Sequence, residues 1–157
     1  MKRSLSIRIL ALAISLLLGS IPALAVERPF ALNGNGVGTF ITDGAGNIIG
    51  ANVTASGTAT HLGMWTAVGS VQFTPDPNNP GRLLSSGAAT ITAANGDKLQ
   101  FVVNGALDPA TGVDTGPMQF VGGTGRFAGV SGGGNFVVEL NPATGAFKLT
   151  AVGRINY

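Results

Sequence analysis

Residues 135–155 read NFVVELNPATGAFKLTAVGRI, two apolar segments joined by a five-residue turn. Alternate positions are apolar: Phe136, Val138 and Leu140 in the first segment and Phe147, Leu149, Ala151 and Ile155 in the second. This period of two is typical of a β-strand with one buried face. In the turn, Asn141 offers a hydrogen-bond acceptor, Pro142 pre-sets φ and Gly145 tolerates the left-handed conformation. The stretch therefore predicts an antiparallel hairpin.

The same turn chemistry recurs along the chain. Residues 108–112, DPATG, nearly repeat 141–145, and we interpret the pair as one turn used twice. Asn95-Gly96 predicts a two-residue hairpin, because both positions tolerate positive φ. Residues 43–47 predict a further hairpin loop, and the three prolines in residues 75–81 exclude that segment from a strand interior.

Short β-branched or aromatic runs separate these turns, and helical periodicity is absent. The expected strands are Gly36–Thr42, Ile48–Ser56, Leu62–Phe73, Leu83–Ala93, Lys98–Gly105, Asp114–Val121, Asn135–Leu140 and Ala146–Ile155. About eight such strands suit a single antiparallel barrel, with a two-sheet sandwich as the rival fold. The hairpin turns argue against a parallel β-helix. The strands before Ala93 are rich in small residues, which indicates either close backbone approach or room for a ligand.

The first 25 residues have the features of a signal peptide. Three basic residues precede an apolar run over residues 9–18, and Ala23-Leu24-Ala25 matches the small-x-small cleavage pattern. The run is well short of the ~20 residues that span a bilayer. We therefore expect a leader, residues 1–25, a β-barrel domain, residues 26–157, no membrane span after cleavage, and a secreted or periplasmic location.

Removing this leader changes the charge of the chain. The full sequence has nine basic and seven acidic residues, but the three basic residues of the leader are Lys2, Arg3 and Arg8. The rest is slightly acidic with no basic cluster, so no nucleic-acid partner is expected. The chain has no cysteine, which excludes disulfides, a lipoprotein anchor and a thiolate metal site. An exported domain without disulfides favours a closed sheet, which leaves no exposed edge.

Residues 120–134, FVGGTGRFAGVSGGG, are the most distinctive segment. The spacing fails the dinucleotide pattern because Gly129 falls one place late after Gly123 and Gly125, and the later glycines exclude a helix. The segment resembles the glycine motif of allene oxide cyclase and dirigent-like barrels. Residues 60–63, THLG, are similar to a stretch in bacterial secreted proteins of the same kind.

The resemblance implies an eight-stranded, calycin-like barrel with a central cavity. It assigns a structural role to the motif residues, which are Gly123, Thr124, Gly125, Arg126, Phe127 and Gly129. It transfers no catalytic residue, because no acid or base of the plant cyclases or dirigent proteins matches a position here.

Candidate cavity residues follow from the strand faces. They are Trp65, Phe101, Phe120, Phe147 and His61, with core packing as the competing interpretation of Trp65 and a rim position bonded to backbone as that of His61. His61 is the sole histidine and has no carboxylate at a diagnostic spacing, so neither a metal nor a cofactor is expected. Ser131 lacks recognisable triad partners, and the five aspartates of residues 26–157 lie at or beside turns.

Three functions remain open. The first is an exported, non-enzymatic barrel that binds or guides a small apolar ligand. The second is an isomerase or cyclase resembling allene oxide cyclase, which requires at least one inward carboxylate or ordered water, and no candidate stands out. The third is a structural or surface-interaction protein with a filled barrel, and homo-oligomerisation stays open. A cavity lined with Trp65, Phe101 and Phe147 but no acid favours binding. An acid with a tyrosine or asparagine at the cavity floor favours catalysis, and a packed interior favours the structural role.

Overall fold

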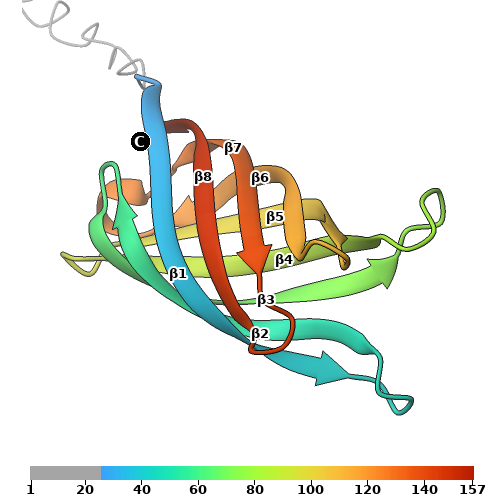
Figure 1. Cartoon of the computed structure of the whole chain (residues 1–157). Coiled ribbons are helices and arrows are strands. Elements are labelled where there is room, and N and C mark those ends of the chain that lie inside the picture. Colours follow the sequence, from blue (N-terminus) through green and yellow to red (C-terminus); the bar gives the residue numbers. More distant parts are fainter. Residues whose placement is uncertain (1–25) are drawn as a thin grey trace, which may run out of the picture.

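The computed structural model describes residues 26–157, and the predicted leader lies outside the described residues. The strands are β1 (Arg28–Thr42), β2 (Ile48–Ala59), β3 (Gly63–Pro75), β4 (Leu83–Ala93), β5 (Lys98–Asp108), β6 (Val113–Gly123), β7 (Ser131–Leu140) and β8 (Ala146–Asn156). Each strand pairs antiparallel with the next, and β8 pairs with β1 to close the barrel (Figure 1). The predicted barrel is confirmed, and the sandwich is excluded.

The two PATG turns have the same geometry. Asp108 Oδ1 accepts a hydrogen bond from Ala110 N at 2.9 Å, and Asn141 Oδ1 accepts one from Ala143 N at 3.0 Å. Gly112 and Gly145 both have φ of 72°. The prediction of one turn solution used twice is therefore confirmed.

The prediction for Asn95-Gly96 was wrong in detail. Gly96 has φ of 87°, but Asn95 does not take positive φ. Gly96 N donates to Ala93 O, and Ala93 N donates to Asp97 O, so Ala94 and Asn95 occupy the centre of the turn. This is a longer hairpin that closes through a left-handed glycine rather than a two-residue loop.

Two strands begin earlier than predicted. β1 starts at Arg28 instead of Gly36, and β7 starts at Ser131 instead of Asn135. The added segments carry Asn33-Gly34-Asn35 and Gly132–Gly134, a composition that favours turns in isolation. Their glycines serve close packing instead. A Cβ at position 34 would lie 2.5 Å from Trp65 Cζ2, and one at position 134 would collide with the Val152 carbonyl.

The two ends of the barrel differ. At one end lie the chain start of β1, the C-terminus and the short turn of 3-10 helix η1 (Gly125–Phe127) (Figure 1). Large side chains fill this closed end, and they are Phe30, Leu62, Trp65, Phe120, Phe127 and Ile155. The opposite end, called the mouth below, carries the β1–β2, β3–β4, β5–β6 and β7–β8 loops.

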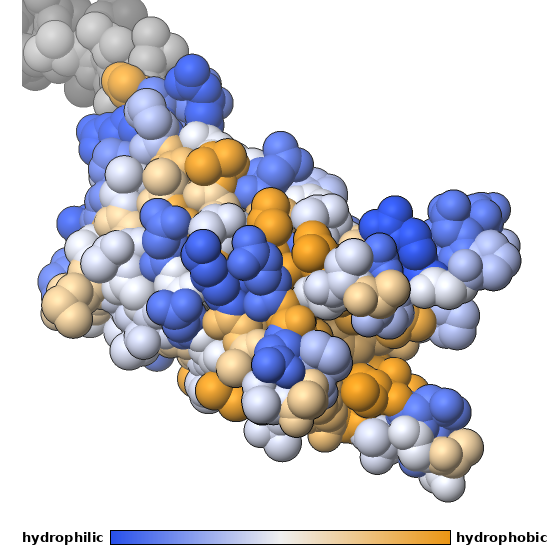
Figure 2. Space-filling model, in the orientation of Figure 1, coloured by the Kyte–Doolittle hydropathy of each residue, from blue (hydrophilic) through white to orange (hydrophobic). Residues whose placement is uncertain are grey.

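The outer surface near the mouth is mixed in polarity. Figure 2 shows two projecting loops, one with a hydrophilic tip and one with a tip of mixed polarity, and hydrophobic surface at their bases. Ile41, Ile48 and Ile49 are exposed on the β1–β2 hairpin. Within residues 26–157 the structure has no helix of the length and apolar character needed to cross a membrane.

We predict that Phe127→Ala destabilises the barrel by about 3–5 kcal/mol, because Phe127 is fully buried in the closed end. Urea denaturation measures the free energy of unfolding. Val121→Ala, on the exposed outer face of β6, is the control and should stay within about 0.5 kcal/mol of wild type. Equal effects of the two substitutions would contradict the packing described for the closed end.

Candidate functional site

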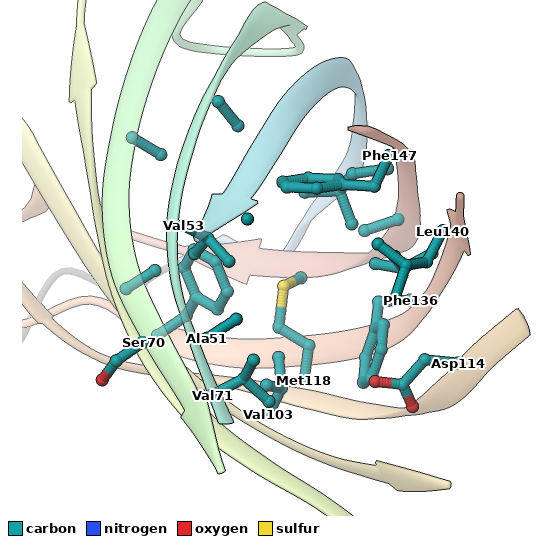
Figure 3. Close-up of a pocket in the computed structure, with 18 of the residues that line it drawn as sticks. Ala51, Val53, Ser70, Val71, Val103, Asp114, Met118, Phe136, Leu140 and Phe147 are labelled. Atoms are coloured by element: carbon teal, nitrogen blue, oxygen red, sulfur yellow. The ribbon is translucent and has the colours of Figure 1, made fainter. Parts of the chain in front are cut away.

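A cavity of about 130 Å³ occupies the half of the barrel nearest the mouth. Its wall is almost entirely apolar, and Figure 3 shows Phe147, Leu140, Phe136 and Met118 around it. Ser70 lines it, but its hydroxyl points away from the space (Figure 3). The interior is therefore packed at one end and hollow at the other, which the filled-barrel hypothesis did not anticipate.

Small side chains create this space. The inward positions around the cavity include Gly38, Ala51, Ala55, Ala67 and Ala89. A Cβ at position 38 would meet nothing closer than 3.6 Å, so this position at the cavity wall accepts a methyl group in ordinary van der Waals contact. Gly36 is different, because a Cβ there would collide with the Phe147 ring. Close approach and unfilled space thus both occur among the small-residue strands, at different positions.

One buried polar pair interrupts the apolar wall. Asp114, second residue of β6, is 8% exposed and lines the cavity. The Ser85 hydroxyl on β4 donates a hydrogen bond to Asp114 Oδ1 at 2.8 Å. Within residues 26–157, Asp114 is the one titratable side chain that lines this cavity. Polar groups buried in an apolar wall cost free energy, so this pair marks a candidate site.

Gly105 makes the pair possible. Strand β5 lies between β4 and β6, and Gly105 pairs with Ser85 in the sheet register. The hydrogen bond from Ser85 to Asp114 therefore passes over Gly105. A Cβ at position 105 would lie 2.8 Å from Asp114 Oδ1 and 2.7 Å from the Thr115 carbonyl. The missing side chain leaves room for the carboxyl group.

Burial raises the pKa of Asp114 above its ordinary value of 3.8. The hydrogen bond from Ser85 and the positive charge of Arg82 oppose this shift without cancelling it. A carboxyl with a raised pKa in a cavity is a common feature of functional sites.

Sequence reasoning missed Asp114 because it lies directly after a turn and was grouped with the turn aspartates. The alternation of β6 held the necessary signal. Met118 and Phe120 face inward, and counting back in steps of two places Gly116 and Asp114 on the same face.

The predicted cavity residues separate into three groups. Phe101 and Phe147 line the cavity. Trp65 and Phe120 lie in the packed core instead, where Phe120 meets Phe30 edge to face with ring centroids 5.0 Å apart. His61 lies at the closed end, in the β2–β3 turn, so the structure does not bring it to the cavity.

His61 contacts the backbone and the C-terminal residue. Its Nε2 donates to the Pro29 carbonyl at 2.9 Å, and its ring packs against Tyr157 with centroids 5.7 Å apart. It has φ of 66°, a left-handed conformation that histidine tolerates better than most residues. Within residues 26–157 no cluster of three metal-ligating side chains occurs.

The glycine-rich segment forms the β6–β7 connection at the closed end. Thr124 Oγ1 accepts a hydrogen bond from Lys98 N at 3.0 Å, and Arg126 Nε lies 3.3 Å from Asp97 Oδ2. Gly125 has φ of 59°, and a Cβ there would collide with the Asp97 carboxylate. Gly129 also has positive φ, and Phe127 is fully buried. These contacts anchor the connection to the β4–β5 turn.

Comparison with known proteins bears on the fold. No family model matches the chain, and no curated protein does. Among solved structures, a pterocarpan synthase dirigent protein superposes with a TM-score of 0.52 over 83% of this chain and 86% of that one. The barrel is dirigent-like. At 15% sequence identity the likeness concerns the fold alone, and it confirms the fold that the glycine-rich segment implied.

Substitution of two inward glycines of the dirigent-like barrel should have different effects on the free energy of unfolding. We expect Gly105→Ala to destabilise by about 1–3 kcal/mol, because the new Cβ collides with Asp114 and with backbone. Gly38→Ala is the matched control and should be neutral or stabilising by up to about 1 kcal/mol, because its Cβ makes only ordinary van der Waals contacts, none shorter than 3.6 Å. Chemical denaturation of both variants tests this. A tolerated Gly105→Ala would show that the Ser85–Asp114 contact does not depend on this clearance.

The raised pKa of Asp114 also predicts a pH dependence. The folded state holds this proton to higher pH than the unfolded state, so the buried carboxyl lowers the free energy of unfolding as pH rises above about 3.8. Asp114→Asn removes this loss. We therefore expect the stability of wild type relative to Asp114→Asn to fall as pH increases above that value, and to be constant below it.

Thermal unfolding of both proteins across this pH range provides the measurement. Asp43 and Asp76 have lowered pKa values, owing first to side-chain hydrogen bonds from Asn47 and Asn79, and give the opposite slope. Their contribution is common to both proteins and cancels in the difference. A difference that is independent of pH, or that grows in favour of wild type, would refute the assignment.

Proposed function

We propose that the protein is exported and that it binds or guides a small, largely apolar molecule in the half of its barrel nearest the mouth. The observation that carries this proposal is the cavity, hollow and apolar where the opposite half is packed. Apolar cavities with a few placed polar groups are the usual form of small-molecule sites. The sequence of residues 1–25 supports export, since basic residues, an apolar run and a small-x-small cleavage pattern follow one another there.

The size of the cavity limits the ligand. A space of about 130 Å³ is close to that of an engineered apolar cavity of ~150 Å³ that binds benzene. A single ring, or a branched chain of similar volume, therefore fits inside, and any larger part of a ligand extends through the mouth.

A cavity-filling substitution tests the proposal. Gly38→Leu directs a large side chain from the wall into the cavity, and we expect it to weaken the binding of toluene at least about tenfold, an effect of roughly 1.4 kcal/mol. Titration followed by NMR on the methyl group of Met118, which lines the cavity, reports binding directly.

Thr39→Leu is the matched control for this experiment. It makes a leucine at the next position of β1, whose side chain points outward. Its toluene affinity should remain within about twofold of wild type, since the cavity wall is unchanged. If wild type binds no toluene, or if both variants bind it as wild type does, the proposal is wrong.

Asp114 favours a second candidate, an isomerase or cyclase resembling allene oxide cyclase. A carboxyl with a raised pKa in an apolar cavity wall is suited to move a proton. For any ligand that the cavity holds, this candidate requires a product whose formation depends on Asp114. Recovery of the ligand unaltered supports binding alone.

A further inference from the structure

One oxygen of the Asp114 carboxyl is left for a ligand. Ser85 donates to Oδ1, and no donor within residues 26–157 reaches Oδ2. The side chain is more than nine-tenths buried, and it lines the cavity close to the β5–β6 turn at the mouth (Figure 3). The cavity wall offers this carboxyl no basic partner, since its remaining lining residues are uncharged. The charge of Arg82, an exposed residue that does not line the cavity, already favours the ionised carboxyl, and a cation that enters beside Asp114 stabilises the buried carboxylate further.

The charges around the mouth have the same sign as this carboxyl. The strand ends and loops of the mouth carry five acidic and two basic side chains, namely Asp43, Asp76, Asp108, Asp114 and Glu139 with Arg82 and Lys148. The closed end carries two acidic and four basic side chains, namely Glu27 and Asp97 with Arg28, Lys98, Arg126 and Arg154. The mouth is therefore negative and the closed end positive, which draws cations toward the cavity.

We propose that the ligand is a small apolar amine, whose protonated nitrogen bonds to Asp114 while its hydrocarbon part occupies the cavity. This inference rests on the proposed function and names the chemical class of its ligand. The charge-assisted hydrogen bond between ammonium and carboxylate is roughly twice as strong as a neutral one. Ser85 positions the carboxyl group by holding Oδ1, so that Oδ2 is presented to the ligand.

The position of Asp114 reduces the cost of bringing a charge into the barrel. It is the second residue of β6, next to the mouth, so an ammonium group bonded to it stays near water while the apolar part lies deeper. A cation within about 4–6 Å also favours the ionised carboxyl and so opposes the effect of burial on the pKa of Asp114. Binding of the amine and ionisation of Asp114 therefore support each other.

Three probes of similar size separate the contributions of charge, of hydrogen bonding and of the apolar ring to binding. Benzylamine, benzyl alcohol and toluene share a single ring and differ in carrying a cation, a neutral hydrogen-bond donor or neither. At about pH 7 a primary alkylamine is protonated, as the side chain of lysine is. We expect wild-type protein to bind benzylamine at least about tenfold more tightly than toluene or benzyl alcohol, measured by NMR titration on the Met118 methyl group.

Two aspartate variants locate the effect. Asp114→Asn should reduce the preference for benzylamine over toluene from about tenfold to about onefold, because the amide carries no charge. Asp108→Asn is the matched control. It removes one negative charge from the same end of the barrel, and its side chain does not line the cavity, so the preference should change by less than about threefold.

The outcomes keep the two proposals distinct. If toluene binds but benzylamine binds no more tightly, or if Asp114→Asn retains the preference, the amine inference is wrong and the apolar site stands. A stronger binding of benzyl alcohol than of benzylamine also overturns the inference, because Asp114 then acts as a neutral group. If none of the three probes binds, the proposed function itself fails.

Discussion

The pairing of β1 with β8 closes the sheet, and the interior of the protein depends on that closure. Its register runs from Arg28 opposite Ile155 to Val37 opposite Ala146. Closure satisfies the backbone groups that would otherwise form two exposed edges, which matters in a chain without cysteine. It also sends alternate residues of every strand into one enclosed volume, so the sizes of those residues decide what the volume contains.

That volume is divided by side-chain size. At the closed end, aromatic rings and the β6–β7 connection fill the barrel, and glycines such as Gly34 provide the clearance that these rings need. Toward the mouth, alanine and glycine face inward at several positions, and the large side chains there, such as Phe147, leave a cavity unfilled. Gly105 illustrates a third use of small residues, because its missing side chain leaves space for the Asp114 carboxyl. Glycine thus allows close packing, a cavity and a polar contact at different points of the same barrel wall.

Predictions from the sequence were accurate where interactions between neighbouring residues determine the structure, and less accurate where contacts between distant strands determine it. Turns were predicted well where local hydrogen bonds determine them, as at Asp108 and Asn141, and less well at Asn95, where the turn type depends on how the flanking strands pair. The early part of β1 was missed because Asn33 and Gly34 favour turns locally, while the packing of Gly34 is set by Trp65 on another strand. Asp114 was missed because it was grouped with the aspartates near turns, and the alternation of β6, which places it on the inward face, was not applied to it.

The sequence by itself determined the all-β class, the approximate number of strands, the antiparallel order and the absence of disulfides. These features depend on alternation over a few residues, on turn chemistry and on composition, all of which are local. The tertiary structure alone decided that Phe101 and Phe147 line a cavity, that Trp65 and Phe120 do not, and that Ser85 meets Asp114 across β5. Those relations arise from the register and closure of strands far apart in the chain, which no local pattern records.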